Sequence, residues 1–139
     1  MASANVDLVR SIFAARERGD YSSADWADAQ MVYVVADGPE PGTWTGLSEI
    51  ARRWRDMLSA FEDHRSLVDE YRELDAERVL VLGHASGRGK TSGLELSALS
   101  TPWANVVHIQ DGKVTKIVLY NDRERALADL GLNPEGDPA

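Results

Sequence analysis

The spacing of apolar side chains predicts two amphipathic helices in the first half of the chain. Between residues 6 and 13 apolar side chains recur every three or four positions, and Gly19 follows where a helix commonly ends. The same period recurs between residues 50 and 61, and Ser48 is the candidate N-cap of that second helix. Each helix therefore presents one apolar stripe that has to be buried against another element.

Strands are predicted for most of the remaining chain. Residues 31–36 are rich in β-branched side chains, and the loop 37–42 that follows contains two prolines and two glycines. Residues 44 and 45 are expected to be extended again. After the second helix, the pattern predicts strands at 67–74, 79–86, 94–99, 103–109 and 114–120, and a closing helix at 122–130 that Asn121 or Asp122 caps.

This order of elements predicts an α+β fold in one domain. Helix, strand and helix come first, and a run of strands then follows without alternating helices, which is typical of an antiparallel sheet. A curved sheet that wraps against a long helix leaves a concave space between the two. We expect a single domain over residues 1–139, with a flexible tail at 133–139.

The hairpin around Asp111 and Gly112 decides which side chains face that space. A two-residue turn pairs Gln110 with Lys113, whereas a type I turn followed by a bulge pairs Ile109 with Lys113. We favour the bulge because it sorts apolar and polar side chains better. The face expected to line the concave space then carries Trp103, Asn105, Val107, Ile109, Ile117, Leu119 and Asn121.

Composition and charge narrow the classes of partner. The 139 residues suffice for one domain with a hydrophobic core, and the apolar share of 43% is near the globular average. The net charge of -8 opposes contact with phosphate backbones, so we expect no nucleic-acid partner. No apolar run approaches the roughly 20 residues of a membrane span, and no targeting segment is visible, so a soluble cytoplasmic protein is predicted.

No metal site is predicted. The chain has no cysteine, and its three histidines, His64, His84 and His108, do not have the spacing of metal ligands.

Five short motifs occur in an order that is typical of one known family. They are Gly19-Asp20, Trp26-Ala-Asp, Gly46-Leu-Ser-Glu-Ile50, Asp111-Gly-Lys-Val114 and Tyr120-Asn-Asp-Arg123. Over residues 5–132 the chain thereby resembles the SnoaL-like proteins of the nuclear transport factor 2-like (ketosteroid isomerase-like) superfamily. The resemblance implies a cone-shaped, strongly curved antiparallel or mixed sheet around a long helix, with an open pocket. It also implies a homodimer formed across the outer face of the sheet.

The resemblance suggests catalytic residues. Ketosteroid isomerases carry an aspartate base just after the first strand, near the position of Asp37, and an oxyanion donor on a long strand, at about the position of Asn105. Their second donor is a helical tyrosine, and Ile12 stands there, which disfavours steroid isomerisation. His84 lies within an apolar strand, where a pocket imidazole acts as a base near neutral pH; the alternative is a hydrogen-bonded structural histidine.

Other side chains are candidates for shaping a pocket. Two amides, Asn105 and Asn121, would be the few polar groups of an apolar cleft; alternatively they bond each other or the backbone. The candidates for the apolar lining are Tyr33, Trp54, Met57 and Trp103, and simple core packing is the alternative for most of them.

These residues allow two classes of function. The first is a cofactor-independent isomerase, cyclase or hydratase that moves protons in an apolar pocket and binds a small apolar organic ligand. The second is a module of the same fold that only binds a ligand or only dimerises. The superfamily contains both classes, so the fold leaves the chemistry open.

Overall fold

A computed structural model gives the fold, and it describes residues 4–17, 25–37, 41–59, 61–89 and 101–133. Side chains are described for all of these except residues 16, 17, 54, 56–59, 61–66, 85–89 and 101. The elements are α1 (Ala4–Glu17), β1 (Ala27–Val35), β2 (Gly42–Thr45), α2 (Leu47–Ser59), β3 (Phe61–Glu73), β4 (Arg78–Gly89), β5 (Thr101–Gln110), β6 (Lys113–Tyr120) and α3 (Arg123–Asp129).

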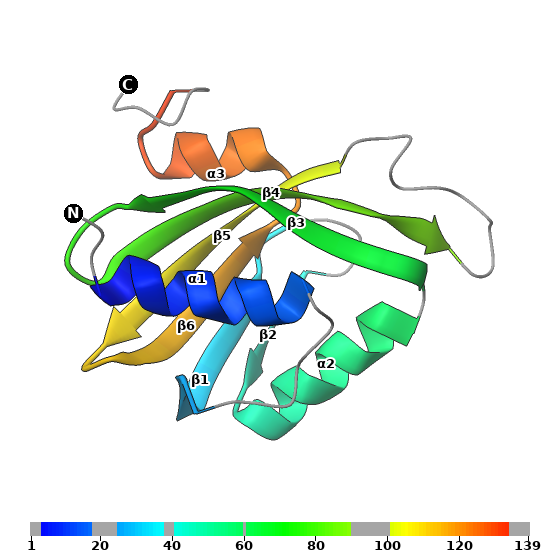
Figure 1. The fold of residues 1–139 in the computed structure, drawn as a ribbon, viewed down its shortest axis with the longest axis horizontal. Coiled ribbons are helices and arrows are strands. Elements are labelled where there is room, and N and C mark those ends of the chain that lie inside the picture. The colour runs from blue at the N-terminus through cyan, green and yellow to red at the C-terminus, as the bar shows by residue number, and fades with distance from the viewer. Residues whose placement is uncertain (1–3, 18–24, 38–40, 60, 90–100, 134–139) are drawn as a thin grey trace.

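The predicted α+β class is confirmed. Six strands form one mixed sheet in the order β2-β1-β6-β5-β4-β3, in which only the β1–β6 pair is parallel. In the described chain the sheet is not closed into a barrel, because β2 and β3 are its two edges. Helices α1 and α2 cover one face of the curved sheet and α3 covers the other (Figure 1). We call these the inner and the outer face.

Each face of the sheet has its own hydrophobic core. The inner core joins Val9 and Phe13 of α1 and Ile50 of α2 to the sheet, so the stripe predicted for the first helix is buried, and of the second stripe the described Ile50 is buried. The outer core is smaller and is closed by Ala126 and Leu127 of α3. The inner face therefore supplies most of the burial that holds the fold together.

The hairpin between β5 and β6 differs from the expected one. Gln110 pairs with Lys113, and both Asp111 (φ 53) and Gly112 (φ 75) have positive φ, which defines a two-residue turn of the primed type. The favoured bulged turn was therefore wrong. A bulge occurs instead at Thr115, because Val114 pairs with Ile109 and Lys116 with His108.

The bulge in β6 nevertheless restores the predicted faces. Beyond it Val107 pairs with Ile117 and Asn105 with Leu119, so odd residues of both strands share one side. Because Trp103, Val107 and Ile117 belong to the core under α1 and α2, the expected concave side is the inner face.

The helix ends match the sequence in part. Asp122 caps α3, since its side chain accepts a hydrogen bond from the backbone of Arg125. Helix α2 begins at Leu47, after Gly46 with φ 89, so Ser48 lies in the first turn and is not the cap. The strand expected at 94–99, Gly19 and residues 134–139 of the tail lie outside the described residues.

Candidate functional site

Asn105 is the one polar side chain within the buried part of the described chain. Its side chain is 6% exposed. In the sheet it pairs with Val81 of β4 on one side and with Leu119 of β6 on the other, and Leu119 pairs in turn with Val35 of β1. Its neighbours on the inner face are apolar. Among the described residues no hydrogen bond engages its amide. An amide with donors and an acceptor is therefore available on this face.

Trp103 lies two residues from Asn105 on the same face of β5. Its indole ring covers Gly83 of β4, and the Phe13 ring from α1 stacks on it with centroids 6.0 Å apart and planes at 24°. The side chain is 5% exposed, and its buried Nε1 has no hydrogen-bond partner among the described residues. Tyr71 of β3 extends the aromatic cluster by an edge contact with Phe13.

Asp37 and Asn121 lie at the same end of the sheet and bind each other. The register that joins Val35 to Leu119 brings these two residues together two positions further along the parallel strands. The carboxylate of Asp37 accepts the backbone N–H of Asn121 at 2.6 Å and that of Asp122 at 3.3 Å. The side-chain amide of Asn121 donates to the carbonyl of Asp37 at 3.1 Å. The predicted alternative for Asn121, a bond to the backbone, is thus present.

The expected pocket-lining residues are only partly described. Tyr33 is buried on the inner face, beside Ile117, and its ring centroid lies 6.1 Å from that of Trp44. The side chains of Trp54 and Met57 on α2 lie outside the described residues.

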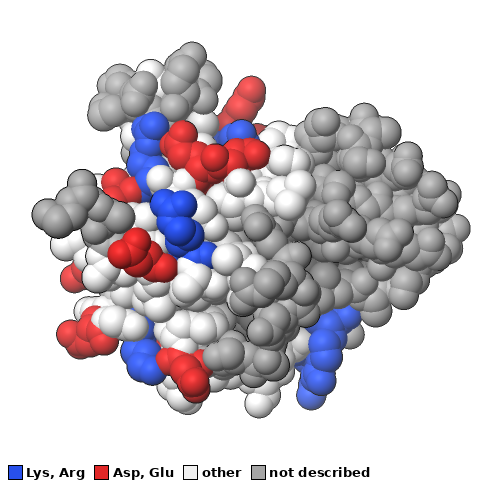
Figure 2. All heavy atoms as spheres, viewed as in Figure 1, with Lys and Arg blue, Asp and Glu red and all other residues white. Residues whose placement is uncertain are grey.

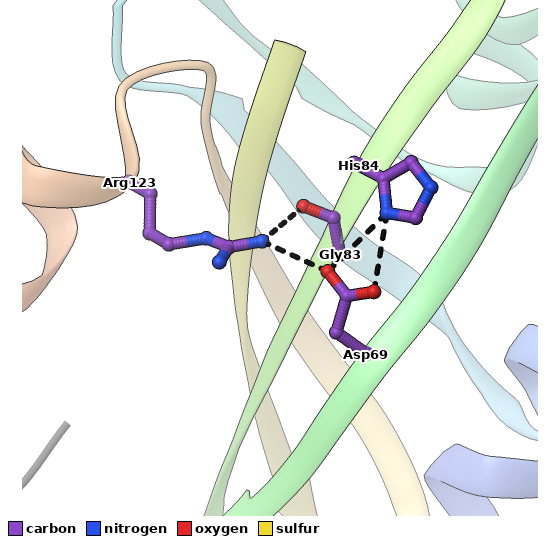
Figure 3. A network of polar contacts seen from close by, with 4 residues as sticks. All are labelled: Asp69, Gly83, His84 and Arg123. Carbon is purple, nitrogen blue, oxygen red and sulfur yellow. Dashed lines mark hydrogen bonds and ion pairs between the residues drawn. The ribbon is translucent and has the colours of Figure 1, made fainter. Parts of the chain in front are cut away.

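His84 lies on the outer face, away from Asn105. It follows Leu80 and Leu82, whose side chains belong to the core under α3. Its Nδ1 lies 3.1 Å from a carboxylate oxygen of Asp69 (Figure 3). The structure therefore brings Asp37, Asn105, Trp103 and Asn121 to one end of the inner face, and it does not bring His84 to them.

The partners of His84 form a network that the sequence did not reveal. Arg123 at the start of α3 donates from Nη2 to Asp69 at 3.2 Å and to the carbonyl oxygen of Gly83 (Figure 3). A bulge between Val68 and Glu70 displaces Asp69 from the ladder and frees it for this contact. The sequence carries no local signal of this bulge.

Charges of both signs mix on the surface. Figure 2 shows acidic and basic side chains interspersed over the described part of the side that it presents, without a patch of one sign.

The groups with shifted pKa values lie off the inner face. Burial lowers the pKa of His108, and burial raises the pKa of Tyr120. In the turn after β3, the backbone N–H of Glu77 and the side chain of Arg78 lower the pKa of Asp75.

The described residues contain no group of three or more histidine, aspartate or glutamate side chains placed to hold a metal ion. No helix in the described ranges is long and apolar enough to cross a membrane.

The comparisons with known proteins define the class. The model of the SnoaL-like domain family matches residues 9–117, so the chain belongs to that family. A search of curated protein sequences finds no significant match.

Solved structures show the same fold at low identity. A nuclear transport factor 2-like protein from Burkholderia thailandensis is 19% identical, with a TM-score of 0.76 over 96% of this chain and 100% of its own. A similar protein of unknown function from Burkholderia pseudomallei is 20% identical, with a TM-score of 0.75 over 91% and 97%. TerC, which was co-crystallised with polyporic acid, is 19% identical, with a TM-score of 0.72 over 92% and 98%.

Proposed function

We propose that this SnoaL-like protein binds a small organic molecule on its inner face and holds an oxygen atom of that molecule at Asn105. One observation carries the proposal: Asn105 is a polar residue, 6% exposed, among the apolar side chains of the inner face, and no hydrogen bond engages its amide within the described chain. Ligand sites of this kind are apolar, with a few well-placed polar groups that fix orientation.

The energetics favour a ligand over a purely structural role. An amide that no protein group bonds forgoes about 0.5–1.5 kcal/mol of hydrogen-bond free energy on this apolar face, whereas an apolar residue of the same shape would pack there without that loss. A carbonyl or hydroxyl oxygen of a ligand recovers that free energy by accepting the amide N–H. The co-crystal of TerC with polyporic acid supports the proposal because that protein has the same fold, and polyporic acid is therefore one probe to try.

Matched probes test this function. α-Tetralone and tetralin share one bicyclic frame and differ in a single carbonyl oxygen. We expect the native protein to bind α-tetralone about tenfold more tightly in titration calorimetry, the value of one hydrogen bond to a buried donor. Asn105→Leu, which nearly keeps the side-chain volume, should abolish the difference. Asn5→Leu is the control, because Asn5 bonds Ala76 at the far end of α1.

A preference for α-tetralone that survives in Asn105→Leu would contradict the proposal. Circular dichroism of each variant verifies that the sheet is intact, so that a loss of binding is not a loss of folding.

A second function, proton transfer at a carbon next to a carbonyl, has one observation in its favour. Asp37 and Asn105 lie at the same end of one face, two strands apart. The carboxylate of Asp37 accepts two backbone N–H groups, and a carboxylate has about four lone-pair positions, so it keeps acceptor capacity for a proton. Asp37 would take the proton while Asn105 stabilises the enolate oxygen, and no cofactor is needed.

Deuterium exchange separates this enzyme from a binding module. In heavy water, a catalytic protein exchanges the α-protons of α-tetralone faster than buffer does, and NMR follows the loss of their signal. Asp37→Asn should abolish the acceleration, and Asn105→Leu should reduce it by about 10²-fold or more. Binding without accelerated exchange by the native protein would leave the binding function alone. His84 has no part in either proposal, because it lies on the outer face.

Homodimerisation across the outer face of the sheet remains a proposal from the resemblance. Light scattering after size-exclusion chromatography tests it: a mass of one chain at micromolar concentration would contradict it.

A further inference from the structure

We propose that the indole N–H of Trp103 is a second hydrogen-bond donor to the ligand, and that the site therefore takes a neutral molecule with two carbonyl-type oxygen atoms. The inference rests on the proposed binding function and names the class of its ligand. It starts from an atom that packing alone does not explain.

That atom is Nε1 of Trp103. The side chain is 5% exposed, and its nitrogen is buried without an acceptor. A buried indole N–H usually finds a partner, and one that does not costs free energy. The ring fills the space between Phe13 and Gly83, a task that needs no nitrogen. The unpaired donor therefore destabilises the folded protein, and an acceptor on a bound ligand removes this destabilisation.

The two donors are placed to act on one molecule. Trp103 and Asn105 are two residues apart on one face of β5, so their Cα atoms are about 7 Å apart. The register that joins Ala104 to Tyr120 puts Trp103 level with the exposed Asn121, at the end of the inner face. In this proposal a ligand enters from this end and spans both donors. Because Nε1 of Trp103 is shielded, a neighbouring side chain has to move aside before the ligand contacts it.

The surroundings favour a neutral acceptor. Tryptophan only donates, and an asparagine amide donates from its nitrogen. Within the described chain, Asn105 is the only polar member of the buried set, so no buried charge there balances an ionic ligand. The carboxylate of Asp37, at the edge of the site, also opposes an anion. Two carbonyl oxygens on a neutral ring system satisfy both donors.

Three probes on one bicyclic frame test the inference. Tetralin, α-tetralone and 1,4-naphthoquinone carry no, one and two carbonyl oxygens. We expect the quinone to bind the native protein about tenfold more tightly than the ketone. Trp103→Phe keeps an aromatic ring and removes the N–H, so it should make the two affinities equal. Trp44→Phe, at the sheet edge, is the matched control and should keep the ratio.

NMR of the indole nitrogen provides a direct readout. In ¹⁵N-labelled protein, the Trp103 indole signal, assigned by its loss in Trp103→Phe, should move downfield on addition of the quinone and stay nearly still with tetralin. Mass spectrometry after the titration verifies that the quinone has not modified the protein.

The outcomes separate the two proposals. If the ketone binds through Asn105 but the quinone gains nothing, or the Trp103 indole signal is unmoved in the quinone complex, the Trp103 inference is wrong and the binding function stands. If the ketone shows no preference over tetralin and Asn105→Leu changes nothing, the binding function itself fails. If Trp103→Phe does not fold, the indole shift in the native protein, assigned through the other three tryptophan variants, decides.

Discussion

The indole ring of Trp103 lies directly against the backbone of Gly83 on the neighbouring strand. A Cβ atom on Gly83 would stand 2.7 Å from Cη2 of the ring and closer still to Cζ2 and to the carbonyl oxygen of Leu67. Real Cβ atoms do not approach other atoms so closely. The position of the aromatic cluster on the inner face therefore depends on the absence of a side chain at Gly83.

Gly83→Ala should lower the free energy of unfolding by about 3 kcal/mol, because a methyl group overpacks this contact. Urea denaturation measures the change. Gly42→Ala is the control, since its Cβ would meet only the tip of the Trp44 ring at 3.1 Å, and a loss below about 1 kcal/mol is expected. Trp103→Leu should not rescue Gly83→Ala, because the backbone oxygen of Leu67 still blocks the methyl group. Full rescue would contradict this account.

Asp37→Ala should destabilise the connection between β1, β6 and α3 by about 2 kcal/mol, since it leaves two backbone N–H groups without their charged acceptor. Asp37→Asn keeps one acceptor oxygen and should lose less. Thermal and urea unfolding measure both. Asp28→Ala removes a local bond to Gln30 two residues away and should cost less than about 1 kcal/mol. Equal losses at the two sites would argue against a bracing role for Asp37.

Arg123→Met should loosen α3 from the sheet, because Arg123 joins this helix to Asp69 of β3 and to Gly83 of β4. We expect a loss of about 2 kcal/mol, as for other partly buried charged hydrogen bonds. Amide hydrogen exchange within α3 should quicken by a matching factor. Arg125→Met is the control: its exposed side chain stands 4.0 Å from Asp129, and the expected change is below about 0.5 kcal/mol.

His108 should make stability depend on pH. Burial, aided by the charges of Lys116 and Arg78, lowers its pKa in the folded protein below the ordinary 6.5. As the pH falls, the unfolded chain therefore binds this proton before the folded protein does. The contribution of neutral His108 to the free energy of unfolding is fully present above pH 6.5 and is lost as the pH falls below it.

Denaturation curves between pH 8 and pH 5 measure this dependence. His108→Gln should flatten the fall in unfolding free energy below about pH 6.5. His84→Gln, which removes another histidine, is the control. This variant should keep the fall in unfolding free energy that His108 causes. An unchanged slope in His108→Gln would exclude the assignment.

The local pattern of the sequence was enough for most of the described elements and for the inner face, although Phe61, which continued the helical period, begins β3. Alternation in β5 and β6 put Trp103, Asn105 and Ile117 on one side, and Asp122 was one of the two residues predicted as the cap from residue type and place. These features depend on neighbours within a few positions, where period and capping chemistry act. The turn type at Asp111 was not so determined, since both turns place a positive φ at Gly112.

The sequence could not predict on which face of the sheet His84 lies. Both faces of β4 are apolar, with Val79 and Val81 inward and Leu80 and Leu82 outward, so alternation there carries no information. The bulge at Asp69, which provides the partner of His84, has no local signature.

The sequence by itself determined most of the described helices and strands, which family they resemble and that Asn105 shares a face with Trp103. Tertiary structure alone decided what each polar group contacts. Asp37 binds the backbone 84 positions away, and Arg123 reaches a carboxylate 54 positions away. Periodicity records burial along one element, whereas a hydrogen-bond partner depends on how distant elements pack, and that is fixed only when the whole sheet forms.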